Sequence, residues 1–160
     1  MKQHPTGRTL AEFKPLKPAE VQLLEACKGG RFANLGGSRP TAGSDANTVR
    51  ADFLRFLALG GSDEAPIHER GIQLNGAWVK GELDLTNATV PTSLAIHHSH
   101  FESRLLLNRA EVVGAFSLMG SQVLGQGGLM VLNAAMAFSC VTGSPPLARF
   151  ACWAHRLAVA

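Results

Sequence analysis

Histidine side chains are the first candidates for chemistry in this chain, because His97, His98 and His100 are close in sequence and His68 lies upstream. A zinc site needs three or four side chains that converge on the ion at about 2.0–2.2 Å. Adjacent residues such as His97 and His98 rarely direct both rings to one ion, and a turn after a strand at Ile96 would expose them. We therefore predict solvated histidines and no metal-binding residue.

Carboxylates and cysteines are the second candidates for chemistry. Pairs of Asp or Glu side chains cleave glycosidic bonds when their separation is fixed, but no pair here recurs at such a spacing. The chain has no serine nucleophile motif, and its cysteines have neither metal spacing nor a catalytic motif nearby. We predict no catalytic residue and no cofactor. The residues considered are Glu82, Asp84, Glu102, Glu111, Cys27, Cys140 and Cys152.

The segment that carries the histidines and these carboxylates repeats with a period of eleven residues. The units, starting at Ile72, read IQLNGAWVKGE, LDLTNATVPTS, LAIHHSHFESR, LLLNRAEVVGA and FSLMGSQVLGQ. Positions one, three and eight are apolar in every unit, and position six is Ala or Ser. A sixth unit, LMVLNAAM from Leu129, keeps these columns after two inserted glycines.

The spacing of the columns favours strands over a helix. Positions one, three, six and eight do not share one face of an α-helix, whereas two pairs separated by two residues are the inward positions of two short strands. One unit cannot bury its own apolar residues, so neighbouring units must stack. The sequence predicts a mainly β fold, a β-solenoid of 11-residue half-coils with about 22 residues per coil.

The small residues of position six predict a tight corner, where a larger side chain would clash with the backbone of the next coil. Substitution of Ala88 or Ala110 by Leu is therefore expected to cost about 1–3 kcal/mol through overpacking.

At these columns the chain resembles the bacterial right-handed β-helix proteins related to the pentapeptide-repeat group, in which small and apolar residues alternate around the coil. The segment VRADFLRFLALGGSDEAPIHERGIQLNGAWVKG, from Val49 to Gly81, is also similar to the entry region of largely uncharacterised bacterial proteins with such repeats. The resemblance covers residues 18–123. It implies a right-handed solenoid and brings no assigned catalytic residues.

The segment before the repeat is expected to form a helical cap. PAEVQLLEAC, from Pro18 to Cys27, has an early Pro and apolar residues at helical spacing. A second helix is predicted to begin near Asn47 or Thr48 and to run to Gly60, covering the first coil. The stretch between the helices, GGRFANLGGSRPTAGSDAN, is predicted to be a loop.

The segment after Gly143 leaves several interpretations open. Its apolar residues fall on one side of a helix that would cap the stack, or bind a partner or a membrane surface. The chain is alternatively a longer repeat protein cut short. We expect three regions: 1–70, a helical cap with loops; 71–136, the solenoid; and 137–160, a tail with a capping helix. The apolar residues are Leu147, Phe150, Ala154 and Leu157.

Composition gives little evidence for a nucleic-acid or membrane partner. The formal charge is +3 and the isoelectric point about 9.0, while residues 71–136 carry three basic and four acidic side chains. The N-terminus lacks an apolar run of signal-peptide length, and no segment is apolar enough to span a bilayer. An odd number of cysteines favours a reducing, cytoplasmic setting.

The outward positions indicate a protein partner, because they include exposed aromatic and apolar residues without an acidic stripe. We predict a non-enzymatic binding or scaffolding module, with a homodimer through a solenoid end as a second kind of contact. Three alternatives stay open: a DNA-mimic inhibitor, as some pentapeptide-repeat proteins are; a hydrolase or lyase near His97–Glu102; and a truncated repeat protein without activity. The predicted interface residues are Trp78, His98, His100, Leu106, Met119 and Met130.

Overall fold

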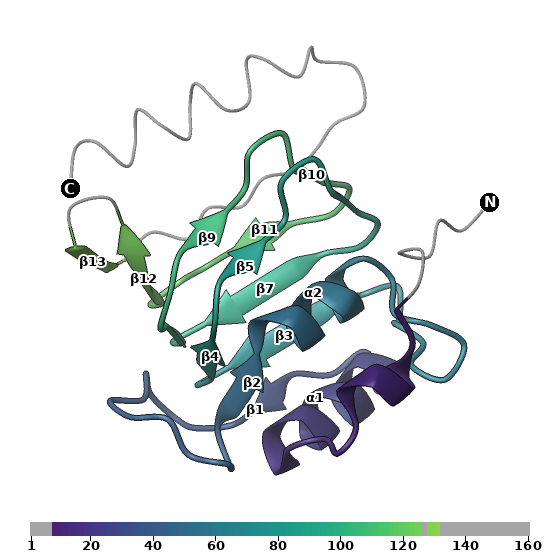
Figure 1. The fold of residues 1–160 in the computed structure, drawn as a ribbon, viewed down its shortest axis with the longest axis horizontal. Coiled ribbons are helices and arrows are strands. Elements are labelled where there is room, and N and C mark those ends of the chain that lie inside the picture. The colour runs from purple at the N-terminus through teal and green to yellow at the C-terminus, as the bar shows by residue number, and fades with distance from the viewer. Residues whose placement is uncertain (1–7, 126–127, 132–160) are drawn as a thin grey trace.

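The computed structural model describes residues 8–125 and 128–131 of the chain. These residues form three helical elements and a series of short strands (Figure 1). The helices are η1 (Leu10–Phe13), α1 (Pro18–Gly29) and α2 (Ala51–Ala58). The strands are β1 (Ala33–Asn34), β2 (Thr48–Arg50), β3 (Ile72–Asn75), β4 (Trp78–Lys80), β5 (Leu83–Asp84), β6 (Thr89–Val90), β7 (Leu94–His97), β8 (His100–Phe101), β9 (Leu105–Leu106), β10 (Glu111–Val112), β11 (Phe116–Ser117), β12 (Gln122–Gly125) and β13 (Gly128–Val131).

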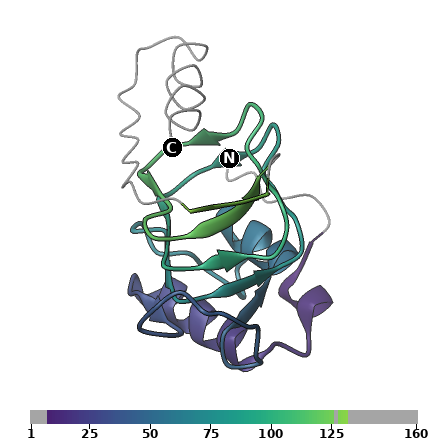
Figure 2. The same cartoon turned by 90° about the vertical axis from the view of Figure 1, so that its left-hand side faces the viewer.

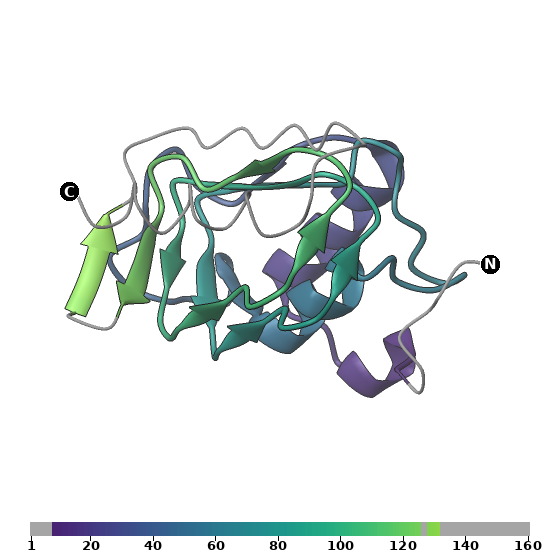
Figure 3. The same cartoon turned by 90° about the horizontal axis from the view of Figure 1, so that it is seen from above.

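The fold is mainly β, and its strands form four sheets in which every pairing is parallel except that of β12 with β13. Sheet I has the order β1-β3-β7-β11, sheet II the order β2-β4-β8-β12-β13, sheet III joins β5 to β9, and sheet IV joins β6 to β10. From β3 onward the parallel partners lie 22 residues apart, as in the pairs of Leu94 with Ile72 and of Leu105 with Leu83. Figure 2 shows successive stretches of chain lying over one another, with α1 below them, and Figure 3 shows the same stretches from above.

The apolar columns of the repeat form the core. Ile72, Leu74 and Val79 are fully buried, as are their counterparts eleven and 22 residues further along. At positions one, three and eight, burial decreases only in the fourth unit, where Leu105, Leu107 and Val112 are half-buried. The prediction that these positions point inward is therefore confirmed. Position six was predicted to point inward as well, and it is fully buried in three of the five units and half-buried at Ala88 and Ala110. The buried members are Ile72, Leu74, Val79, Leu83, Leu85, Val90, Leu94, Ile96, Phe101, Phe116, Leu118 and Val123.

Position five of each of the first five units has a left-handed backbone, with φ between 43° and 72°. This conformation turns the chain between the two strands of each unit, and glycine adopts it at no steric cost. Only two of the five residues are glycine, so residue type indicates this turn only weakly. The five residues are Gly76, Asn87, His98, Arg109 and Gly120.

The two corners at position six differ in burial, and serine occurs only at the buried one. Between sheets I and II the corner residues are fully buried, and the Ser99 hydroxyl accepts a hydrogen bond from the Ala77 backbone N–H at 3.1 Å. The Ser121 hydroxyl accepts one from the Ser99 N–H at the same distance. The corner at Ala88 and Ala110 is half-buried, so the expected overpacking cost is larger at Ala77 than at either of those positions.

The N-terminal segment contains the helices we expected and two strands that we did not expect. Helix α1 packs against β1, β2 and β3, and α2 packs against β2 and β5. The prediction that the second helix begins near Asn47 or Thr48 was wrong, because Thr48–Arg50 pairs in parallel with Trp78–Lys80 and the helix begins at Ala51. Likewise, β1 forms inside the predicted loop and pairs with β3.

Helix α2 occupies the place next to β5 that a further strand of sheet III would take. It also supplies a hydrogen-bond donor there, because Arg55 Nε lies 2.7 Å from the carbonyl oxygen of Asp84. Where a helix replaces a neighbouring strand, the backbone groups at the strand edge need hydrogen-bond partners from side chains.

The C-terminal end of the described chain differs from the prediction of a sixth stacked unit. Strand β13 turns back and pairs with β12 in antiparallel fashion, with Met130 opposite Val123. Residues Gly128–Val131 thereby cover the free edge of β12. The rest of this unit, the region 137–160 and its predicted capping helix lie outside the described residues. Within the described part of the chain, the helices are too short and too polar to cross a membrane.

Candidate functional site

An open hollow of about 470 Å³ lies against the outer face of sheet II. Three parts of the chain enclose it: the start of α1, the turn before β2, and the outward side chains of β4 and of the residue that follows β8. Its lining combines two lysines, two carboxylates, two hydroxyls and an indole. These residues are Lys17, Gly43, Ser44, Asp45, Thr48, Trp78, Lys80 and Glu102.

Strand register places Trp78 at the centre of the outer face. Thr48 lies beside it on one neighbouring strand and His100 on the other. The rings of Trp78 and His100 stack, with their centroids 4.1 Å apart and an angle of 19° between their planes. Gly43 packs against the indole as well, because a Cβ there would lie 2.9 Å from its Cδ1 atom. His100 continues the row toward Gln122, with Nδ1 and Oε1 3.1 Å apart. The indole is therefore fixed in place.

Lys80 and Glu102 are two exposed charges on the sheet side of the hollow. The pairing of Val79 with Phe101 places Glu102 one strand beyond Lys80, and the Glu102 N–H bonds to the Val79 carbonyl at 3.0 Å. Neither side chain forms an ion pair with another of the described residues. Opposite charges on neighbouring strands are thus both available to a ligand.

The turn before β2 is held rigidly by Asn47. Its Oδ1 atom accepts a hydrogen bond from the Ser44 N–H at 2.7 Å, and its amide group donates one to the Ala42 carbonyl at 3.2 Å. The Asn47 carbonyl also accepts the Trp78 N–H at 2.9 Å, which ties the turn to β4. The turn residues that line the hollow are therefore positioned by the same backbone that extends sheet II.

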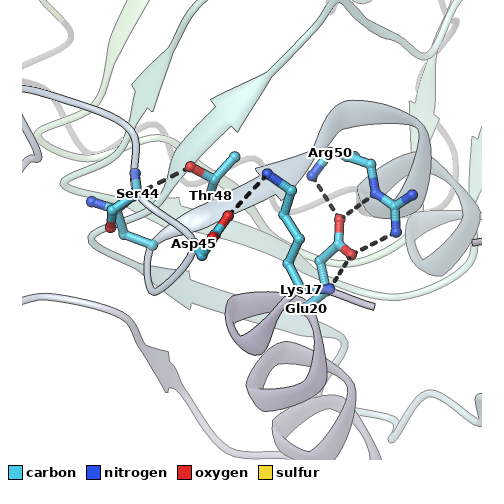
Figure 4. A network of polar contacts seen from close by, with 7 residues as sticks. Lys17, Glu20, Ser44, Asp45, Thr48 and Arg50 are labelled. Atoms are coloured by element: carbon cyan, nitrogen blue, oxygen red, sulfur yellow. Dashed lines mark hydrogen bonds and ion pairs between the residues drawn. The ribbon is translucent and has the colours of Figure 1, made fainter. Parts of the chain in front are cut away.

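A buried ion pair anchors α1 beside the hollow (Figure 4). Glu20 is fully buried, and Arg50 Nε and Nη2 lie 2.7 Å from its Oε1 and Oε2 atoms. The N–H groups of Arg50 and Lys17 each donate a further hydrogen bond to this carboxylate at 3.0 Å. Burial raises the pKa of Glu20, but these hydrogen bonds and the Arg50 charge outweigh it and hold the pKa below its ordinary value.

Lys17 is the link between this ion pair and the hollow. Its ammonium lies 3.6 Å from Asp45 Oδ1, and the Ala19 N–H at the start of α1 bonds to the Asp45 carbonyl at 3.4 Å. Of the two lysines that line the hollow, Lys17 therefore already has a carboxylate partner, whereas Lys80 has none within residues 8–125 and 128–131.

The three neighbouring histidines are directed to different places. His97 lies on sheet I, with Nε2 3.0 Å from the Ser117 hydroxyl, and burial together with the His98 charge lowers its pKa. His98 is exposed at a left-handed corner, and His100 stacks on Trp78. Among the residues that the structure describes, no three His, Cys, Asp or Glu side chains are placed to hold one metal ion.

The residues predicted as an interface are brought together only in part. Trp78 and His100 stack on sheet II, and the His98 N–H bonds to the Met119 carbonyl at 2.8 Å near the end of sheet I. Leu106 is half-buried on sheet III, so it belongs to another side of the molecule. The backbone of Met130 pairs with Val123, and its side chain lies outside what the structure describes.

The reactive side chains considered in the sequence are dispersed. Asp84 lies on sheet III and Glu111 on sheet IV, while Glu102 follows β8 of sheet II. Hydrogen bonding with the Thr86 side chain, and then with the Thr86 N–H at 2.8 Å, lowers the pKa of the Asp84 carboxylate. Cys27 is buried in α1, and burial raises the pKa of its thiol to about 12, so this thiol is a poor nucleophile.

Sequence reasoning missed three charged residues of the hollow, Lys17, Asp45 and Lys80, and considered Glu102 only as a catalytic carboxylate. Lys17 and Asp45 come from the segment treated as a cap and loop, and no periodicity connects them to the repeat. Lys80 and Glu102 both occupy position nine, and a comparison of alternate units would have placed them on one face beside Trp78 and His100. An alignment of all five units hides this pairing, because neighbouring units contribute their strands to different sheets.

Comparison with known proteins identifies no relative: no family model, no curated protein and no solved structure matches the chain significantly. The function proposed below therefore rests on the geometry of this chain alone.

Proposed function

We propose that the chain is a β-solenoid that serves as a non-enzymatic binding or scaffolding module for a protein partner in the bacterial cytoplasm. The 22-residue offset between parallel partners supports the solenoid, because it recurs in all four sheets. Each set of 22 residues then supplies one strand to each sheet. The resemblance to right-handed β-helix proteins of the pentapeptide-repeat group belongs to the same proposal.

The hollow on sheet II is the observation that carries the binding function. It combines an aromatic side chain held in a fixed orientation with two exposed, unpaired charges of opposite sign. Rigid aromatic residues next to charged groups are typical of the centres of protein interfaces. The dispersal of Asp84, Glu102 and Glu111 over three sheets favours binding over glycosidic hydrolysis.

The charge distribution favours a protein over DNA mimicry. Along sheet II, Glu102 is next to Lys80, and on sheet III, Asp84 is next to Leu106. Neither of these sheets presents a strip of acidic residues, which a mimic of the DNA backbone would require.

Affinity capture from a bacterial lysate tests this function. Lys80→Glu should abolish capture of a partner that the wild-type chain binds, because it places a like charge beside Glu102. Arg104→Glu is the matched control, since Arg104 is also exposed but does not line the hollow. Circular dichroism should show that both variants stay folded.

A variant that unfolds the chain separates specific capture from nonspecific adsorption. Leu85→Asp serves this purpose, because Leu85 is fully buried and an unpaired charge there should collapse the core. Capture that survives Lys80→Glu, or that persists with Leu85→Asp, would contradict a partner site in the hollow.

A further inference from the structure

We propose that the hollow on sheet II binds an extended segment of the protein partner that carries one acidic and one basic side chain two residues apart. This inference rests on the proposed binding function and adds the chemistry of the segment recognised. Lys80 contacts the acidic side chain and Glu102 the basic one.

The pairing of the surrounding charges singles out these two residues. Arg50 and Glu20 bind each other, and Lys17 binds Asp45. Lys80 and Glu102 remain without an ion-pair partner among residues 8–125 and 128–131. A ligand of a single charge would satisfy one of them and be repelled by the other, whereas a ligand with both charges satisfies both.

Spacing favours an extended segment. Neighbouring strands lie about 4.8 Å apart, and alternate side chains on one face of an extended peptide lie about 6.5–7 Å apart. The flexible side chains of Lys80 and Glu102 can span this difference. A compact zwitterion would fill only part of the hollow, whose volume of about 470 Å³ accommodates several residues.

The indole of Trp78 supplies the third contact. Its ring is occupied by His100 through stacking and by Gly43 at Cγ and Cδ1, so a second ring has little room to stack there. The indole N–H has no acceptor among the described residues. It is available to donate a hydrogen bond to a peptide carbonyl, which every extended segment provides.

Titration with short capped peptides, followed by NMR, tests the inference. The probes are acetylated and amidated peptides with the central sequences Asp-Ser-Lys, Asp-Ser-Asp and Lys-Ser-Lys. The protein carries Trp153→Phe, which leaves Trp78 as the only indole signal. The mixed peptide should shift that signal in the millimolar range and bind at least about threefold more tightly than either single-sign peptide.

Charge reversals provide the matched controls. Lys80→Glu should shift the preference to Lys-Ser-Lys, and Glu102→Lys should shift it to Asp-Ser-Asp. The double variant should recover the preference for the mixed peptide. Equal affinities for the three peptides, or preferences unchanged by both single reversals, would overturn the inference.

The two proposals fail in different ways. If Lys80→Glu abolishes capture of the partner but no peptide preference exists, only the mixed-charge segment is refuted. If capture is insensitive to Lys80→Glu, the hollow is not the partner site, and the proposed function fails with it.

Discussion

The hydroxyl of Ser99 accepts a hydrogen bond from the backbone N–H of Ala77, 22 residues earlier in the chain, at 3.1 Å. The same hydroxyl donates to the His97 carbonyl at 2.7 Å. It thereby supplies the acceptor for the Ala77 N–H, and it adds a second donor to the His97 carbonyl, which also accepts the Gly76 N–H at 3.1 Å. Ser121 likewise accepts a hydrogen bond from the backbone N–H 22 residues earlier, that of Ser99, but it donates to the Ile96 carbonyl of the preceding unit.

Removal of the Ser99 hydroxyl should destabilise the fold. Ser99→Ala leaves the Ala77 N–H without its partner, whereas the His97 carbonyl keeps the Gly76 N–H. One unpaired backbone group at this buried corner costs about 1–3 kcal/mol of unfolding free energy. Urea denaturation measures the loss. Ser103→Ala is the control, because the Ser103 side chain is half-buried and has no hydrogen bond recorded within the described chain. Equal effects of the two substitutions would contradict a structural role for the corner hydroxyl.

Acid should weaken the anchor between α1 and β2. Glu20 has a pKa below its ordinary value of 4.5 in the folded state, so its contribution to stability is present above pH 4.5 and decreases as the pH falls through the folded pKa. The free energy of unfolding of the wild-type chain should therefore drop between pH 7 and pH 3 by more than that of Glu20→Gln.

At neutral pH, Glu20→Gln should itself cost about 2 kcal/mol, because Arg50 loses its charged partner while staying partly buried. Glu12→Gln serves as control, since Glu12 is exposed and caps only the short helix η1. If the Glu20→Gln variant matches the wild-type chain in its pH dependence, the ion pair is not the acid-sensitive element.

Substitutions at two of the left-handed corners should change the stability of the chain in opposite directions. Arg109→Gly should stabilise the chain by roughly 0.5 kcal/mol, because relief of the strain at φ 54° exceeds the added entropy of the unfolded chain. Gly76→Ala should destabilise it by about 2 kcal/mol or more, since the new Cβ would lie 2.5 Å from the Gly36 carbonyl oxygen. Thermal melting of both variants shows whether each stabilises or destabilises the chain. Asn108→Gly is the control for Arg109→Gly.

The Cys27 thiol should resist alkylation in the folded protein. Its pKa of about 12, which results from burial, leaves almost no thiolate at neutral pH. Mass spectrometry after treatment with iodoacetamide should find Cys27 unmodified without denaturant and modified in urea. Rapid labelling of Cys27 in the absence of urea would show that α1 does not bury this side chain.

The inward columns could be predicted because each of their positions is apolar in every unit, and strand alternation then determines which side chains are buried. The corners could not be predicted fully, because His98 and Arg109 adopt a conformation that their residue types disfavour. Strands β1 and β2 were missed for another reason. They lie outside the periodic segment and are defined by backbone pairing with β3 and β4.

The hollow was predictable only in part. Trp78 and His100 were recognised as outward residues, but their stacking depends on the 22-residue register. Lys17 and Asp45 reach the hollow through the ends of α1 and of a Gly-rich turn, which tertiary packing alone brings together.

Duplication of one complete repeat tests the proposed solenoid most directly. A second copy of residues 94–115, placed before Phe116, supplies each sheet with one more strand in register. It should therefore give a single cooperative unfolding transition with a melting temperature no lower than that of the original chain. The same duplication lacking Asn108–Ala110 shifts the register and should melt at a lower temperature. If the complete duplication destabilises the chain as much as the shortened one, the strands do not stack as successive 22-residue turns.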